Sequence, residues 1–336
     1  MSWPDYPTGF SASTALTLAN FVQQAYFQLF VNAGTPPPPF GFSSYPLQMP
    51  PSDYALLYTI QGSESTPYDY FGYVVTGPSL INEGQPMVAF VLRGTESGTE
   101  WFDDIIDSSQ TAFTGSGTTS LGLAHKGFTE IYSGFSYTNS NTGVSSETLA
   151  TVMSALSTLY TTGYVPDLVI TGHSLGGALA TLMALDIAAN QSISSFNNTL
   201  TCYTFGSPRV GDPATLVAAF NDYVTNGTIV SYRVANSLDV VPTLPPDVYY
   251  YTDILVDSPF KKYNYKTVKG LCPVDSILAD LDFHSLNSYA AGLNNLINPP
   301  TSLQSPRPVR RRPATVSRPP IEAMPPGPRP AGPPNA

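Results

Sequence analysis

Residues 169–178 read VITGHSLGGA, and this stretch decides the fold of the chain. An apolar run ending at Ile170 leads into a Gly-x-Ser-x-Gly turn around Ser174, and a run of helix-forming residues follows from Ala178. A strand, a tight turn and a helix in this order are the context in which such a serine acts as a nucleophile. The flanking glycines leave room for the turn, because a Cβ there would collide with the neighbouring strand or helix. We therefore predict that Ser174 is a nucleophile at the N-terminus of a helix.

The composition bounds the class of protein. The chain has 336 residues, of which 42% are hydrophobic, enough for one large core or two smaller ones. It has no apolar run of about 18 residues, so we expect no transmembrane segment. Residues 1–30 do not read as a signal peptide, yet the Lys-poor composition suits export, so we expect a secreted protein and leave a cytoplasmic location open. Two cysteines and three histidines predict neither a disulfide framework nor a metal site.

Charge is unevenly distributed along the chain. Residues 302–336 carry a net charge of +5 and contain eleven prolines, whereas residues 1–301 carry a net charge of −15. We expect residues 1–301 to form the folded domain and residues 302–336 to form a disordered Pro/Arg-rich tail. So acidic a domain should not bind nucleic acid and should be repelled by anionic phospholipid, although it tolerates a neutral ester surface.

The apolar pattern alternates between strands and helices. We predict strands at 54–60, 71–76, 87–92, 200–205 and 228–234, and helices at 14–29, 148–160 and 214–223. The first two strands should form an antiparallel pair, and the later alternation predicts a mostly parallel sheet covered by helices, the α/β class. The helix at 14–29 should pack on the core, and its polar face contains Asn20, Gln23, Gln24 and Gln28. Its apolar side consists of Leu18, Phe21, Val22, Ala25, Tyr26 and Leu29.

A nucleophilic serine needs a base, and the base needs an orienting acid. In an α/β-hydrolase the serine comes first, then the acid, then the histidine, so His284 is the one histidine in a permitted position. His173 adjoins the serine with its ring directed away, and His125 lies upstream. Of ten aspartates between Ser174 and His284, Asp239 directly follows a predicted strand. We predict that Ser174, Asp239 and His284 are the catalytic residues.

Further blocks occur in a familiar order. They are VAFVLRGT at 88–95, AHKGF at 124–128, GHSLGG at 172–177, TFGSPRVGD at 204–212 and NSLDVVPTLPP at 236–246. Together they resemble the class 3 lipase family, the fungal-type triacylglycerol lipases and feruloyl esterases with an α/β-hydrolase fold. Ala124 departs from the family pattern, which has valine there. The resemblance extends over about residues 54–293 and implies the same three catalytic residues.

The resemblance also implies an oxyanion hole. One donor is the backbone N–H of Leu175, the residue after the nucleophile. By resemblance the second donor is Thr95, through its backbone N–H and its hydroxyl. His125, by the same resemblance, is structural.

Residues 97–107 follow the predicted strand that ends near Thr95. Ser97 and Glu100 form a capping-box pattern at the start of a short helix. One face of this helix is apolar and consists of Trp101, Phe102, Ile105 and Ile106. By resemblance this helix is a lid over the site, which would expose its apolar face at a lipid surface. The alternative is a surface helix that stays packed down.

The sequence therefore predicts a serine carboxylester hydrolase without cofactor or metal. We expect a monomeric triacylglycerol lipase that binds lipid or another neutral ester at an oil–water interface. An esterase for short or aromatic acyl groups, like the feruloyl esterases, is the alternative, and the acidic charge disfavours a phospholipase A1. A non-catalytic scaffold is disfavoured because all three catalytic positions and Thr95 are present.

Overall fold

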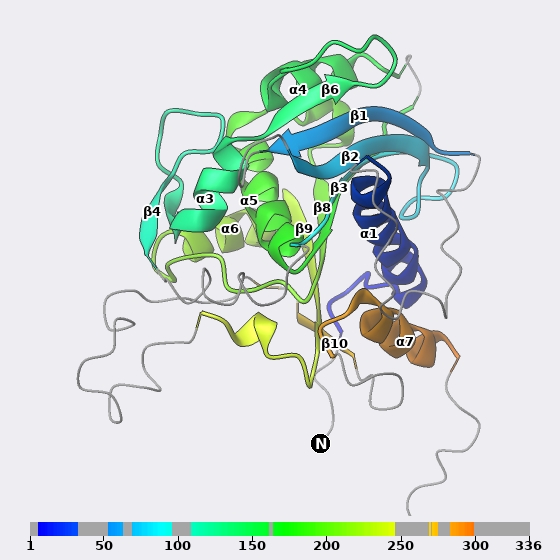
Figure 1. Ribbon diagram of the computed structural model, residues 1–336, viewed down its shortest axis with the longest axis vertical. Coiled ribbons are helices and arrows are strands. Elements are labelled where there is room, and N and C mark those ends of the chain that lie inside the picture. Colours follow the sequence, from blue (N-terminus) through cyan, green and yellow to red (C-terminus); the bar gives the residue numbers. More distant parts are fainter. Residues whose placement is uncertain are drawn as a thin grey trace, which may run out of the picture. The chain divides into compact units, whose positions relative to one another are not determined.

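One eight-stranded sheet runs through the protein in the order β10-β9-β8-β7-β3-β2-β1-β6 (Figure 1). The computed structural model describes residues 6–32, 53–62, 69–95, 109–160, 164–245, 269, 271–274 and 283–298, all of which lie in the unit Met1–Pro299. The strands of the sheet are β1 (Ala55–Gly62), β2 (Asp69–Pro78), β3 (Pro86–Leu92), β6 (Ser136–Asn139), β7 (Asp167–His173), β8 (Leu200–Phe205), β9 (Ile229–Asn236) and β10 (Leu271–Val274). A second sheet pairs β4 (Gln110–Phe113) with β5 (Gly122–His125).

Strands β3, β7, β8, β9 and β10 are parallel to one another. Strands β2, β1 and β6, at the other end of the sheet, pair antiparallel. Parallel pairs join β3 to β7, β7 to β8, β8 to β9 and β9 to β10. Antiparallel pairs join β1 to β2, β2 to β3 and β1 to β6, which confirms the predicted hairpin at the start of the sheet. Strand β6 beyond that hairpin was not predicted, because its four residues, SYTN, carry little apolar signal.

Helices cover both faces of the large sheet. They are α1 (Ala12–Asn32), α3 (Lys126–Ser133), α4 (Leu149–Ser157), α5 (Leu175–Asn190), α6 (Leu216–Thr225) and α7 (Leu286–Ile297), with short 3₁₀ turns at Ser194–Phe196 and Val241–Thr243. One core lies under α3, α4, α5 and α6, and a second lies under α1 and α7, which contact each other. Figure 1 shows α1 and α7 apart from the helices of the first group.

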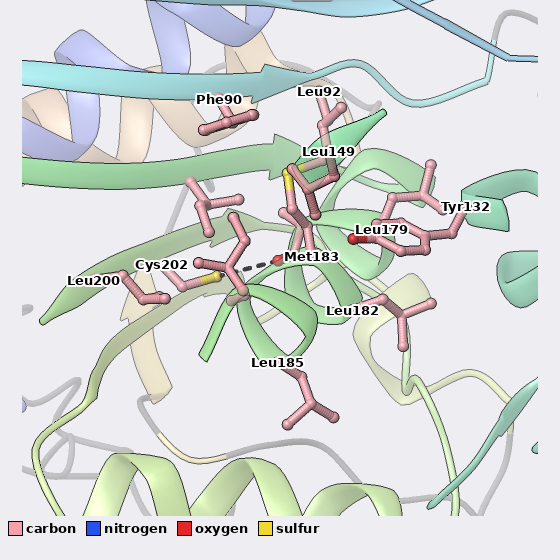
Figure 2. Packing of buried hydrophobic residues seen from close by; sticks show 14 of the residues in the cluster. Phe90, Leu92, Tyr132, Leu149, Leu179, Leu182, Met183, Leu185, Leu200 and Cys202 are labelled. Carbon is pink, nitrogen blue, oxygen red and sulfur yellow. Dashed lines mark hydrogen bonds between the residues drawn. The ribbon is translucent and has the colours of Figure 1, made fainter. Parts of the chain in front are cut away.

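Helix α5 is the centre of the first core. Every residue from Leu175 to Ile187 is buried, as expected for a helix that is apolar on all sides. Figure 2 shows Met183 on the side of α5 that faces Phe90, Leu92, Leu200 and Cys202 of the sheet, with Leu182 and Leu185 directed away from these residues. The Cys202 thiol points at the carbonyl of Ala180, and burial raises its pKa to about 12, so it is an inert core residue.

Helix α1 includes the predicted helix at 14–29 and extends it at both ends. Leu18, Phe21 and Val22 are buried in the second core, as the apolar pattern predicted. The assignment of Gln23 and Gln24 to a polar outer face was wrong, because both side chains are buried. The Gln23 amide donates to the side chain of Asn287 in α7 at 3.4 Å, so α7 contacts part of the polar face that a single helix pattern leaves to water, while Asn20 of that face stays exposed.

No helix among the described residues is both long and apolar enough to cross a membrane.

Truncation of Leu179 tests how much the core around α5 contributes to the free energy of unfolding. Its side chain is fully buried between α5 and the sheet, so Leu179→Ala should lower the free energy of unfolding by about 2–5 kcal/mol through lost burial and a residual cavity. Leu159→Ala is the matched control, because the Leu159 side chain is 44% exposed. Urea unfolding of both variants measures the difference. Equal losses would contradict the placement of α5 at the centre of the core.

Candidate active site

Ser174 stands at the sharp turn between β7 and α5. Its backbone has φ 57° and ψ −127°, a conformation that costs a non-glycine residue about 1–3 kcal/mol. The turn is held because the Ser174 N–H donates to the carbonyl of Phe205 at 2.9 Å. A Cβ on Gly172 would lie 2.1 Å from the carbonyl oxygen of Gly176, and a Cβ on Gly176 would lie 2.4 Å from the carbonyl oxygen of Arg93. The two glycines of the motif are therefore required by close backbone contacts, as predicted.

The three residues predicted to be catalytic lie in one hydrogen-bonded row. Nε2 of His284 lies 2.8 Å from Oγ of Ser174, and Nδ1 of His284 lies 2.7 Å from Oδ2 of Asp239. The Asp239 side chain is fully buried, whereas that of His284 is 27% exposed. A carboxylate only accepts, so Nδ1 carries the proton and Nε2 is left to accept the proton of the serine hydroxyl. This geometry can activate the Ser174 oxygen.

Three donors hold the Asp239 carboxylate in place. Besides His284, the Val241 N–H donates to Oδ1 at 2.9 Å, and the Tyr289 hydroxyl donates to Oδ2 at 2.6 Å. The Tyr289 oxygen in turn accepts from the N–H of Asn236 at 3.2 Å. Burial raises the pKa of Tyr289 well above its usual value, so this hydroxyl keeps its proton and remains a donor. A buried carboxylate needs such donors to remain charged.

The main chain on both sides of the His284 peptide is also fixed. The Asn236 side-chain amide donates to the carbonyl of Phe283 at 2.9 Å, and Nε2 of His173 donates to the carbonyl of His284 at 2.7 Å. The next residue, Ser285, is the N-cap of α7, and its hydroxyl accepts from the N–H of Ser288 at 3.2 Å. These contacts set the position from which the imidazole reaches Ser174.

The chain segment after β3 borders the serine on its other side. A Cβ on Gly94 would lie 2.8 Å from the Cβ of Ser174. The buried guanidinium of Arg93, with its carbon 4.8 Å from the centre of the Phe71 ring, donates through Nη1 to the Gly94 carbonyl at 2.7 Å. In a trans peptide the N–H points away from the C=O, so this bond orients the N–H of Thr95 away from the guanidinium. The structure thus places Thr95 and Leu175, the predicted oxyanion donors, on backbone that adjoins Ser174.

The predicted lid residues Trp101, Phe102, Ile105 and Ile106, with the rest of 97–107, lie outside the described residues.

His125 is described and buried, and its ring stacks on Phe128 with centroids 4.2 Å apart. The described residues contain no group of three His, Cys, Asp or Glu side chains that could hold a metal ion.

Sequence reasoning missed the polar residues that support the row. Tyr26 was assigned to an apolar helix face and Asn236 to a family block, while Tyr289 was not singled out at all. Each of these residues carries a hydrogen-bonding group within an otherwise apolar helix or strand. That combination was the one feature of the sequence that could have predicted a buried hydrogen bond.

A mostly parallel sheet with helices on both faces, together with Ser174, Asp239 and His284 in this order along the chain, defines the α/β-hydrolase fold. Residues 89–249 match the sequence model of the family Lipase (class 3), which confirms the resemblance to the class 3 lipases. The chain is 36% identical over 182 residues to a lipase of Rhizomucor miehei, in a match that covers 52% of this chain and 44% of that protein. It is 31% identical over 211 residues to phospholipase A1-II 3 of Oryza sativa subsp. indica, which covers 58% and 49%.

A shorter match is 40% identical over 105 residues to the secreted mono- and diacylglycerol lipase 1 of Fusarium solani, covering 31% of this chain and 28% of that one. The chain thus spans about half the length or less of the curated relatives it matches. Among solved structures, the native Rhizomucor miehei lipase propeptide complex aligns with a TM-score of 0.50 at 22% identity. That alignment covers 82% of this chain and 73% of the other and supports the α/β-hydrolase fold.

A methyl group at Gly206 tests how tightly the row is packed. A Cβ there would lie 3.0 Å from Oδ2 of Asp239 and 3.1 Å from Cε1 of His284, and the residue has φ +57°. Gly227→Ala is the matched control, because Gly227 has φ +83° but no atom within 4 Å of the added Cβ. Both variants should lose about 1–3 kcal/mol from backbone strain. Only Gly206→Ala should also shift the NMR resonances of the His284 ring; unchanged resonances would contradict the described packing.

Burial of His173 predicts a stability that depends on pH. Its neighbours with titratable groups are Tyr26, His284 and Tyr289. Burial, followed by the nearby His284, holds the His173 pKa well below its usual 6.5 in the folded protein. Between these two pKa values only the unfolded chain binds the proton, so stability should fall as pH drops below about 6.5, by up to about 1.4 kcal/mol per pH unit.

Urea unfolding of wild type and His173→Gln between pH 7 and pH 4.5 measures this effect. The variant lacks the titrating group and should lose stability less steeply with falling pH. Parallel pH profiles for the two proteins would show that His173 does not carry this proton linkage.

Proposed function

We propose that this chain is a serine carboxylester hydrolase that acts on lipid esters, with triacylglycerols as its substrate class. The observation that carries the proposal is the hydrogen-bonded row from Ser174 through His284 to Asp239 at a strained strand-to-helix turn. The match to the class 3 lipases supports the same reaction class. We assign the catalytic roles to these three residues.

The proposed reaction proceeds through an acyl-enzyme. Oγ of Ser174 attacks the ester carbonyl carbon while Nε2 of His284 takes the hydroxyl proton, and Asp239 keeps the proton on Nδ1 and stabilises the imidazolium. The tetrahedral intermediate collapses, and the leaving alcohol takes the proton from Nε2. Water then attacks the acyl-enzyme with His284 again as base, which releases the fatty acid and restores the serine.

Negative charge develops on the carbonyl oxygen during both attacks. We assign its stabilisation to the N–H of Leu175 and to the N–H and hydroxyl of Thr95. A preorganised donor of this kind contributes about 3 kcal/mol to the stabilisation of the transition state. The bond from Arg93 to the Gly94 carbonyl supports this assignment, because it orients the Thr95 N–H before substrate arrives.

The surface beside the acid favours an apolar substrate. Leu238 and Val240, on either side of Asp239 in the sequence, are 44% and 57% exposed. The names of the relatives include lipases and phospholipases A1, and the net charge of −15 over residues 1–301 favours a neutral ester over an anionic phospholipid surface. A neutral triacylglycerol or diacylglycerol fits these observations best.

Three further assignments belong to the same proposal. We assign residues 97–107 to a lid that is displaced at an oil–water interface, with Trp101 and Ile105 on its apolar face. We propose that the protein is a monomer with a catalytic domain of residues 1–301 and a Pro/Arg-rich tail of residues 302–336. We also propose that it is exported, since one relative is named a secreted lipase.

The proposal predicts that a fluorophosphonate probe labels the wild-type protein and that Ser174→Ala loses both labelling and ester hydrolysis. The expected loss in kcat is at least about 10⁴-fold, because the nucleophile is removed while the fold is kept. Ser154→Ala is the matched control, because Ser154 is an exposed serine in α4, and this variant should keep both probe labelling and ester hydrolysis. Absence of labelling and hydrolysis in the wild type would contradict the proposed function.

The substrate class has its own test. Hydrolysis of tributyrin and of a long-chain triglyceride is measured against substrate concentration across the solubility limit. A lidded lipase should show a jump in rate once droplets form and should cleave the long-chain ester. Saturation below the limit with cleavage of short esters alone would identify an esterase and contradict the lid.

A further inference from the structure

His173, which takes no part in the proposed reaction, lies next to the nucleophile with its ring buried. Its Nδ1 lies 2.9 Å from the hydroxyl oxygen of Tyr26 in α1, and its Nε2 lies 2.7 Å from the carbonyl oxygen of His284. The Tyr26 oxygen also accepts from the N–H of Gly94 at 2.7 Å. A continuous chain of hydrogen bonds therefore runs from the segment before Thr95 to the main chain of the base.

The direction of every bond in this chain is determined. A backbone carbonyl only accepts, so Nε2 of His173 must carry a proton. Burial lowers the pKa of His173, so the ring is neutral and Nδ1, which is left without a proton, accepts from the Tyr26 hydroxyl, whose oxygen accepts from the Gly94 N–H. The ring is thus the neutral Nε2–H tautomer, and each of its polar atoms has one partner.

The geometry points to His173 and Tyr26 as positioning residues of the active site. We propose that they form a fixed link that sets the distance between the oxyanion segment at Gly94–Thr95 and the imidazole of His284. The inference rests on the proposed function, since it assigns these residues to that reaction. Neither residue touches the reacting atoms; each acts on a group that does.

The chain fixes both sides of the reaction centre at once. On one side the Gly94 N–H binds Tyr26 while the Gly94 carbonyl binds Arg93, so both polar groups of that residue are held. On the other side the His284 carbonyl binds His173. Displacement of a catalytic group by about 1 Å can lower a rate about 100-fold, so a link between the two sides has a measurable effect on kcat.

The proposed link also requires an uncharged His173 ring, because His284 must accept a proton beside it. Its ring centroid lies 4.7 Å from that of His284, which itself becomes positive during the reaction. A second positive imidazole at that distance would oppose the proton transfer. Burial holds the pKa of His173 well below its usual value, which is consistent with a link that stays uncharged while the base is protonated.

The experiment compares the hydroxyl of Tyr26, which lies in α1 and contacts His173 and Gly94, with the hydroxyl of Tyr73, which binds the main chain of α1. Tyr26→Phe removes the link but keeps the ring, and it should lower kcat about 10- to 100-fold with KM changed less than about 3-fold. Tyr73→Phe is the matched control: its buried hydroxyl donates to the carbonyl of Phe21 in α1 at 2.7 Å, away from the reaction centre. It should lose similar stability and keep its kcat. Equal kcat values for the two variants would overturn the inference.

A second pair of variants separates position from bulk. His173→Gln retains an amide that can donate to the His284 carbonyl and accept from Tyr26, whereas His173→Leu retains neither group. The glutamine variant should therefore recover part of the kcat that the leucine variant loses. Equal losses in the two variants would show that His173 acts by packing alone, against the inference.

The tautomer is read directly by ¹⁵N NMR of the histidine rings, which is practical because the chain contains three histidines. His173 should show the neutral Nε2–H form at pH 7.5 in the wild type, and the resonance of its Nδ1 should shift in Tyr26→Phe, because that nitrogen loses the hydrogen bond from the tyrosine hydroxyl. A protonated Nδ1 in the wild type would overturn the inference. Fluorophosphonate labelling of the wild type keeps the two questions apart, since its absence would reject the proposed reaction while the tautomer would still decide whether the link exists.

Discussion

Ser174 occupies a backbone conformation that residues with a side chain rarely adopt, and much of the site depends on it. The cost of about 1–3 kcal/mol is borne by the packing of α5, which is buried from Leu175 to Ile187. Because the backbone reverses there, the serine oxygen stands at the end of β7 and at the start of a helix, where free N–H groups face the negative charge that develops in the proposed reaction. The same reversal brings Gly176 against the carbonyl of Arg93, so β3 ends beside the serine.

The proposed base and acid, His284 and Asp239, are held by polar side chains and by one main-chain N–H. Asp239 follows β9, accepts a backbone N–H of its own turn, and is joined to α7 through Tyr289. Asn236, the last residue of β9, binds the carbonyl before His284. Because these bonds join the end of β9 to α7 and to the residue before His284, rigid elements position the row.

Much of this arrangement was predictable because it depends on local pattern. The turn around Ser174 follows from glycines and an apolar strand, and chain order restricts the choice of base to His284. The burial of Gln23 was not predictable, because it depends on α7, which lies more than two hundred residues away in the sequence. The hydroxyl of Tyr26 escaped prediction for the same reason, since helical periodicity assigns a tyrosine to a face without saying what its oxygen meets.

The most direct test of the account is a crystal structure of the protein after reaction with an alkyl phosphonate. We expect a bond from phosphorus to Oγ of Ser174, with a phosphoryl oxygen about 3 Å from the backbone nitrogens of both Leu175 and Thr95 and the Nε2 of His284 beside the leaving-group position. Phosphorus on another residue, or an oxygen turned away from these two nitrogens, would contradict the account.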